Sequence, residues 1–126
     1  MQHTDPTTSA TIDVVQHYND NFNNGDVDGV VAAMTDDCVV ETPMPPPDGS
    51  RFQGQDAVRA LWNDFFQSSS SIEFETEDIF ASGDRYLVQW TFRWVGQDNE
   101  PGRVRRVDLF KVKDGKVAEK LVYVKG

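Results

Sequence analysis

The chain has 126 residues, which is enough for one domain with one hydrophobic core and too few for two ordinary domains. A hydrophobic fraction of 38% and a charged fraction of 26% are typical of a globular protein and argue against disorder. The net charge of −9 argues against nucleic acid as a partner. Neither a membrane-spanning apolar run nor a signal peptide is evident, so we expect no membrane partner and a cytoplasmic location.

The cysteine and histidine content points to no metal site. Cys38 is the single cysteine, so an intrachain disulfide is impossible, and a buried apolar role is favoured over a nucleophilic one. His3 and His17 have no cysteine or histidine at ligand spacing. We therefore expect no metal and no cofactor.

The first ten residues are polar and predict a flexible N-terminal tail, so the domain is expected to span residues 11–126. Ser9 or Thr11 can cap a first helix, whose apolar stripe has helical spacing: Ile12, Val15, Tyr18 and Phe22. Asp26 can cap a short second helix over residues 27–34. The two together predict a helical hairpin.

The middle of the chain predicts a strand, a loop and a third helix. Residues 38–42 are β-branched and predict a short strand. Residues 43–50 are rich in proline and predict an extended loop, which is either a lid at a pocket mouth or a plain connector. Asp56 is the expected cap of the clearest helix, whose apolar face is Val58, Leu61, Trp62, Phe65 and Phe66.

The remainder of the chain predicts strands. Residues 72–80 alternate in polarity, and residues 86–94 present one aromatic face. Residues 103–113 and 117–125 flank Asp114-Gly115, a strong hairpin turn. Helices followed by strands indicate an α+β fold with the helices packed on one face of an antiparallel sheet.

Three stretches resemble one known superfamily. Residues 17–43 (HYNDNFNNGDVDGVVAAMTDDCVVETP) resemble the opening of ketosteroid isomerase and of SnoaL-like polyketide cyclases. Residues 52–66 (FQGQDAVRALWNDFF) resemble their third helix, and residues 107–124 (VDLFKVKDGKVAEKLVYV) their terminal hairpin. The chain thus resembles the nuclear transport factor 2-like superfamily. The resemblance implies a curved antiparallel sheet wrapped around three helices, an apolar pocket for a small-molecule ligand, and a homodimer.

The resemblance implies roles for two residues. Tyr18 lies seven residues before Gly25, as does the tyrosine with which ketosteroid isomerase donates a hydrogen bond to its substrate's carbonyl. Asp108 matches the second donor, an aspartic acid kept protonated by apolar surroundings. The alternatives are structural: a core tyrosine bonded to a backbone carbonyl, and an ion pair of Asp108 with Arg106, which shares its strand face.

The acid positions of the superfamily are not kept. Thr42 stands where ketosteroid isomerase has its base, and Val122 where SnoaL-like cyclases and limonene epoxide hydrolase carry an acid. Lys120 is expected to share the pocket-facing side of the last strand with Val122, where it is either a base or binder of acidic substrate or a surface lysine.

The aromatic and apolar side chains of the sheet and third helix are expected to line the pocket or to fill the core: Trp62, Phe66, Val88, Trp90, Phe92 and Phe110. Three functions stay open. The chain is an enzyme that polarises a carbonyl of an apolar substrate with Tyr18 and Asp108, a binding protein that has lost its base, or an oligomerisation module. The last would use the outer sheet face around Arg105 and Leu109.

Overall fold

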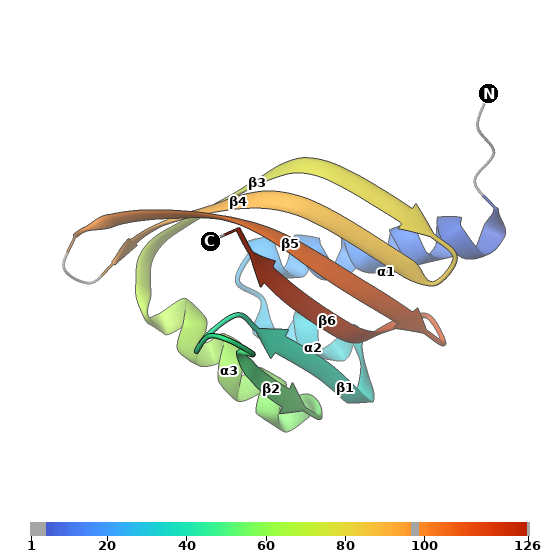
Figure 1. The fold of residues 1–126 in the computed structure, drawn as a ribbon. Helices are drawn as coiled ribbons and strands as arrows, with labels where there is room; N and C mark the ends of the chain where they lie inside the picture. The colour runs from blue at the N-terminus through green and yellow to red at the C-terminus, as the bar shows by residue number, and fades with distance from the viewer. Residues whose placement is uncertain (1–4, 97–98, 126) are drawn as a thin grey trace.

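The structure is a computed structural model that describes residues 5–96 and 99–125. Three helices precede most of a curved six-stranded sheet and cover one of its faces (Figure 1). The helices are α1 (Pro6–Asn23), α2 (Val27–Ala32) and α3 (Gln55–Gln67). The predicted α+β fold is confirmed. Of the predicted N-terminal tail, residues 1–4 lie outside the described residues.

Two helices begin at residues other than the predicted caps. Helix α1 starts at Pro6, because Asp5 accepts a hydrogen bond from the Thr8 backbone nitrogen at 2.8 Å and proline suits the first helical position. Residues 6–10 are therefore helical instead of part of a loose tail. Helix α3 follows Gly54, which has a φ of 90° and no side-chain cap, and Asp56 lies within its first turn. There its negative charge interacts favourably with the helix dipole and stabilises the helix.

The sheet has the strand order β2-β1-β6-β5-β4-β3. Its strands are β1 (Met34–Thr42), β2 (Ser50–Gln53), β3 (Ser69–Ser82), β4 (Arg85–Gly96), β5 (Pro101–Lys113) and β6 (Lys116–Val124). Strand β1 pairs with β6 in parallel, and the other pairs are antiparallel. Strand β2 and the parallel pair were not predicted, because the end of a proline-rich loop carries no strand pattern.

The hairpin of β5 and β6 contains a one-residue bulge. Its turn is the predicted Asp114-Gly115, with φ values of 54° and 77° that suit a tight hairpin. Pairing runs from Lys113 opposite Lys116 to Val112 opposite Val117, but then Lys111 is opposite Glu119. Ala118 is therefore the extra residue, and side chains beyond it change faces relative to Val117.

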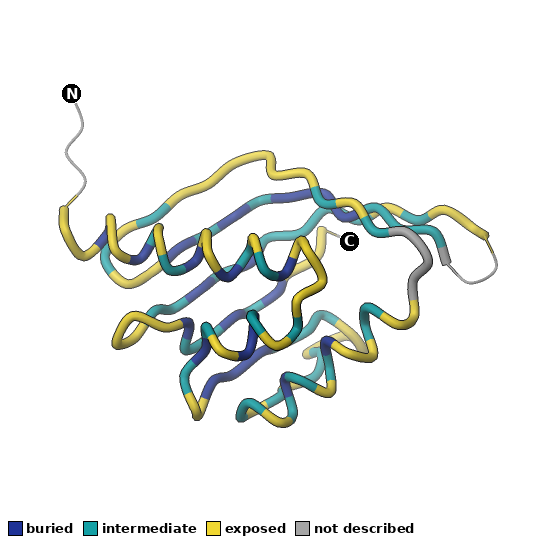
Figure 2. Tube along the Cα trace, turned by 180° about the vertical axis from the view of Figure 1, so that it is seen from behind, coloured by how far each residue is buried: buried dark blue, intermediate teal, exposed yellow. Residues whose placement is uncertain are grey.

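The core lies between the helices and the concave face of the sheet. The buried faces of the helices look toward the strands in Figure 2. The stripe of α1 is buried through Val15, Tyr18 and Phe22, as its spacing predicts. Alternate residues of β4 complete the layer from the sheet side: Tyr86, Val88, Trp90 and Phe92.

Candidate small-molecule site

Two oppositely charged side chains lie together on the concave face. The register of β5 and β6 places Phe110 opposite Lys120 and Asp108 opposite Val122, so Asp108 and Lys120 are diagonal neighbours. Lys120 Nζ lies 3.8 Å from Asp108 Oδ2. Lys120 is 2% exposed and Asp108 is 3% exposed. Of the alternatives that the sequence left open, an ion pair of Asp108 with Arg106 is not formed. Asp108 pairs with Lys120, whose side chain is buried instead of reaching to water.

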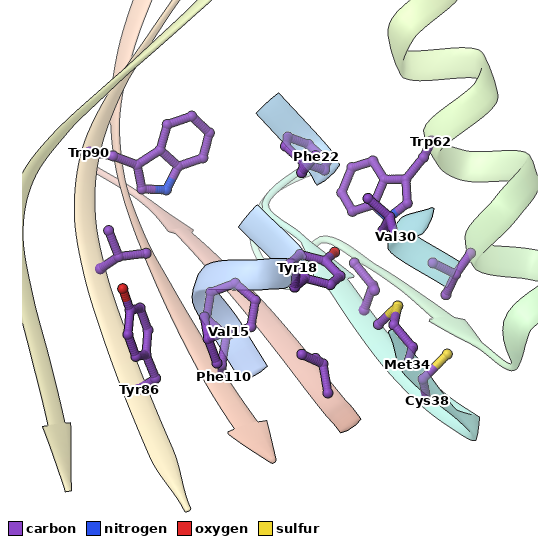
Figure 3. Close-up of a cluster of buried hydrophobic side chains, with 14 of the residues drawn as sticks. Val15, Tyr18, Phe22, Val30, Met34, Cys38, Trp62, Tyr86, Trp90 and Phe110 are labelled. Carbon is purple, nitrogen blue, oxygen red and sulfur yellow. The ribbon is translucent and has the colours of Figure 1, made fainter. Parts of the chain in front are cut away.

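Aromatic rings surround the ammonium group of Lys120. The distances from Nζ to the ring centroids are 4.2 Å for Phe22, 4.8 Å for Trp62, 5.2 Å for Tyr18 and 5.7 Å for Phe110. In Figure 3, Trp62 reaches from α3 and Trp90 from β4 toward Phe22 on α1. At these distances ring faces attract a cation. We call the four rings around Nζ the aromatic cage.

Burial moves the pKa values of Lys120 and Asp108 toward each other. It lowers the pKa of Lys120 from 10.5 to about 8, against the opposing effect of Asp108. Burial also raises the pKa of Asp108, while Lys120 and Arg106 oppose that rise. Desolvation disfavours both charged forms, so it favours moving the proton from the ammonium to the carboxylate. Burial thus acts on both groups in the direction of their uncharged forms.

Tyr18 is fully buried in the same part of the core. Its ring packs edge-on against Phe110, with 5.5 Å between centroids. Burial, and then the charge of Asp108, raise the pKa of its phenol well above 10. The phenol from α1 and the carboxyl from β5 thus lie in one core, and Lys120 Nζ lies over the ring of the first and beside the second.

Several buried polar atoms here have no hydrogen-bond partner among the described residues. Those at the concave face are Tyr18 Oη, Trp62 Nε1, Trp90 Nε1, Arg106 Nε and Asp108 Oδ1. The indole N–H groups of Trp62 and Trp90 lie near Tyr18 and Asp108 and partly offset the rise in the pKa of each. Neither N–H completes a hydrogen bond. Buried polar groups are nearly always paired in proteins. Such a group of unpaired atoms is typical of a place where a polar ligand group or water binds.

A small cavity of about 40 Å³ reaches the charged pair. Its walls come from α1, β3, β4, β5 and β6: Asn19, Phe22, Asn23, Phe74, Thr76, Val88, Trp90, Asp108 and Lys120. Asn23 and Thr76 are exposed and mark the mouth between α1 and β3. One water needs about 10–15 Å³ of such space, so the cavity accepts roughly three small atoms.

The structure separates the predicted aromatic and apolar wall residues of the sheet and third helix into three groups. Val88 and Trp90 line the cavity with Asp108 and Lys120. Trp62 and Phe110 belong to the aromatic cage. The other two predicted aromatic wall residues, Phe66 and Phe92, pack in the core away from the cavity lining.

Thr42 and Val122 lie elsewhere. They line a surface groove beside the proline-rich loop, and the Thr42 hydroxyl donates to the Met44 carbonyl at 3.3 Å. Arg106 stacks its guanidinium over Trp90 and Phe92, at 5.7 and 5.2 Å from the ring centroids. The structure therefore does not bring these three residues to the cavity lining.

Sequence reasoning missed the residues of the mouth. Asn19 and Asn23 are four residues apart on one face of α1, and Phe74 and Thr76 alternate along β3. Both spacings were visible in the sequence. Nothing in the sequence showed that the C-terminal end of α1 lies beside the middle of β3.

The described residues contain no group of three or more His, Cys, Asp or Glu side chains arranged for a metal ion. No helix in the described part of the chain is long and apolar enough to span a membrane. The cavity lining itself offers a carboxyl, an amine, two amides, a hydroxyl and apolar walls.

The fold is that of the nuclear transport factor 2-like class. The chain belongs to the SnoaL-like domain family, whose pattern matches residues 15–120. It is 32% identical to an NTF2-like protein of unknown function from Mesorhizobium loti. The match covers 98% of each chain, with a TM-score of 0.83. A comparison with curated proteins gave no match.

Other solved structures share the fold at lower identity. An LEH-like epoxide hydrolase of M. tuberculosis is 24% identical, with a TM-score of 0.79 and coverage of 95% of this chain and 86% of that one. SalBIII, an epoxide hydrolase/cyclase-like enzyme in pyran ring formation in salinomycin, is 20% identical. Its TM-score is 0.80, with coverage of 93% and 92%. At these identities the likeness establishes the fold alone.

Proposed function

We propose that the chain is a small-molecule enzyme that moves a proton beside a carbonyl group of an apolar substrate, as an isomerase, cyclase or lyase does. The observation that supports this is the Asp108–Lys120 pair, which is almost wholly buried and lines the cavity. Strongly shifted acid–base groups in a cavity are typical of catalytic sites. The structural relatives include an epoxide hydrolase and a cyclase-like enzyme, which agrees with small-molecule chemistry on this fold.

The neutral form of the pair supplies both catalytic groups. The Asp108 carboxylic acid donates to the substrate's carbonyl oxygen, and the Lys120 amine removes a proton from the adjacent carbon. The product of this step is an enol, with an ammonium and a carboxylate on the protein. Returning the proton at another carbon completes an isomerisation. Lys120 thus takes the role of the base that Thr42 and Val122 lack.

The proposal gives the carbonyl contact to Asp108 before Tyr18, because Asp108 lines the cavity and Tyr18 does not. Tyr18 contributes its ring to the aromatic cage. The substitution Tyr18→Phe separates the two assignments. If the phenol holds the carbonyl, turnover falls far more than binding does; if it only builds the cage, both change little.

Deuterium exchange tests the proposal without a known substrate. Butanone in D₂O is incubated with the protein, and NMR follows exchange of the protons beside the carbonyl. We expect protein-dependent exchange that falls by roughly 10²–10⁴-fold in Lys120→Met and Asp108→Asn. Lys116→Met is the matched control, because Lys116 is an exposed lysine at the start of the same strand.

The alternative is a non-catalytic binding protein, which the small cavity and the absence of an acid at Thr42 and Val122 favour. Binding of butanone without any exchange above that of Lys120→Met would support this alternative and contradict the enzyme. A homodimer through the outer sheet face stays a prediction from the sequence. Sedimentation of the chain at several concentrations tests it, and a monomer throughout would contradict it.

A further inference from the structure

Lys120 differs from the other lysines of the chain in its surroundings. Lys113, Lys116 and Lys125 are exposed and Lys111 is half-buried, whereas Lys120 is buried and lines the cavity. Lysines that react with carbonyl carbons are those whose amine is desolvated in an apolar pocket. We propose that Lys120 forms a Schiff base with a small neutral aldehyde or ketone in this cavity. The inference rests on the proposed function and adds a covalent intermediate to it, in which the Asp108 carboxylate, 3.8 Å from Nζ, replaces the Lys120 amine as the base that removes the proton.

The Lys120 nitrogen is available as a nucleophile. Its ion-pair partner, Asp108 Oδ2, lies at 3.8 Å, which is too long for a strong hydrogen bond. The ionisable groups that face it among the described residues are Asp108 and Arg106 from β5 and Tyr18 from α1. With the pKa of Lys120 lowered to about 8, part of the lysine is a neutral amine near neutral pH.

Asp108 can carry the protons that the reaction requires. As the nitrogen adds to the carbonyl carbon, the Asp108 acid gives its proton to the oxygen and then takes one from nitrogen, which leaves a neutral carbinolamine. The acid next protonates the hydroxyl, which leaves as water while the nitrogen lone pair forms the C=N bond. The products are an iminium, a carboxylate and one water, so atoms and charge balance.

The aromatic cage favours the product of this step. Its four rings, at 4.2–5.7 Å from Nζ, stabilise a cation at that nitrogen. The iminium carries its positive charge at the same nitrogen and beside the same carboxylate. The surroundings that hold the ammonium therefore also hold the iminium.

The cavity limits the kind of carbonyl compound. Its volume of about 40 Å³ accepts the reactive end of a molecule, about three atoms, while the remainder lies at the mouth. Phe74 and Val88 make the walls apolar, and the exposed Asn23 can bond a polar tail at the mouth. The class that fits is an unbranched aldehyde or methyl ketone.

Reductive trapping tests the inference on the full chain. The protein is incubated with propanal and cyanoborohydride at about pH 7, and peptide mapping by mass spectrometry locates each propyl group. We expect Lys120 to be modified at least tenfold faster than Lys111, Lys113, Lys116 or Lys125. The α-amino group, which also has a low pKa, is resolved from it by the map. Equal or slower labelling of Lys120 would overturn the inference.

Variants separate this inference from the proposed function. Lys120→Met is expected to lose the trapped adduct, and Asp108→Asn to slow trapping at Lys120 while the amine remains. Faster trapping in Asp108→Asn would contradict the proton-carrying role. If wild type exchanges the butanone protons but gives no adduct on Lys120, the covalent step is wrong and the proposed function stands. If neither occurs, both are wrong.

Discussion

The two faces of the sheet carry the same kinds of charged groups in opposite surroundings. On the outer face, Arg105 binds Glu77 through two hydrogen bonds of 3.1 and 2.5 Å, and the pKa of Glu77 falls to about 2, chiefly because of Arg105. On the concave face, burial raises the pKa of Asp108 and leaves one of its oxygens unpaired. A bidentate arginine at a solvated surface favours the charged form of a carboxyl group, whereas burial in an apolar cavity favours its neutral form.

The largest expected effect comes from breaking the concave pair. Lys120→Ala leaves the Asp108 carboxyl without its partner and an empty space inside the aromatic cage. We expect a loss of about 3–5 kcal/mol in the free energy of unfolding, measured with urea. The double substitution Asp108→Asn with Lys120→Met keeps the volume and removes both charges, so it should be close to wild type. Equal losses in both variants would show that the charge pair is not the cause.

The pH dependence of stability sharpens the comparison. The pKa of Lys120 is about 8 in the folded chain and 10.5 ordinarily, so the unfolded chain binds more protons between these values. Stability contributed by this group therefore rises as the pH rises from 8, by about 2 kcal/mol at pH 10. Lys120→Met should lack the rise in urea unfolding at matched pH. A parallel rise in the variant would assign it to another group.

Removing the unpaired phenol hydroxyl of Tyr18 is expected to raise stability, by less than Lys120→Ala lowers it. Tyr18→Phe removes a buried hydroxyl that has no partner among the described residues, so we expect a gain of about 1 kcal/mol in stability. Tyr123→Phe is the control, since that side chain is exposed. Thermal unfolding measures both. A loss of stability in Tyr18→Phe would mean that the hydroxyl is bonded in solution.

The smallest effect is expected on the outer face. Arg93 contacts Glu75 at 3.2 Å, and both side chains are well exposed. Arg93→Gln should cost less than about 1 kcal/mol, and added salt should remove the difference, because water screens exposed pairs. A larger loss would show that an exposed ion pair of the outer face contributes to stability as the buried pair does.

Much of the fold followed from side-chain spacing. The α1 stripe with Val15 and Phe22 and the aromatic face of β4 with Trp90 were predicted, because each periodicity is a local property of the sequence. Helix starts were less predictable. Asp5 and Pro6 lie in a polar stretch, and their capping role depends on one hydrogen bond.

The site was only partly predictable. The resemblance to ketosteroid isomerase pointed to Tyr18 and Asp108, which lie in one core. Lys120 was singled out as one possible base by its place on the pocket-facing side of the last strand. Sequence rules favour a lysine that reaches water, and they gave Asp108 the partner Arg106. The partner and the cavity depend on how four strands and the end of α1 meet, which no local pattern encodes.

The bulge at Ala118 decides which chemical group the interior receives. With unbroken pairing from the turn, Phe110 would stand opposite Glu119, and the acid instead of the amine would point among the rings. Deleting Ala118 would thus place Glu119 instead of Lys120 in the interior, although the remainder of the hairpin sequence is unchanged. The number of residues in β6, and not only their identity, therefore determines the charge of the side chain that enters the aromatic cage.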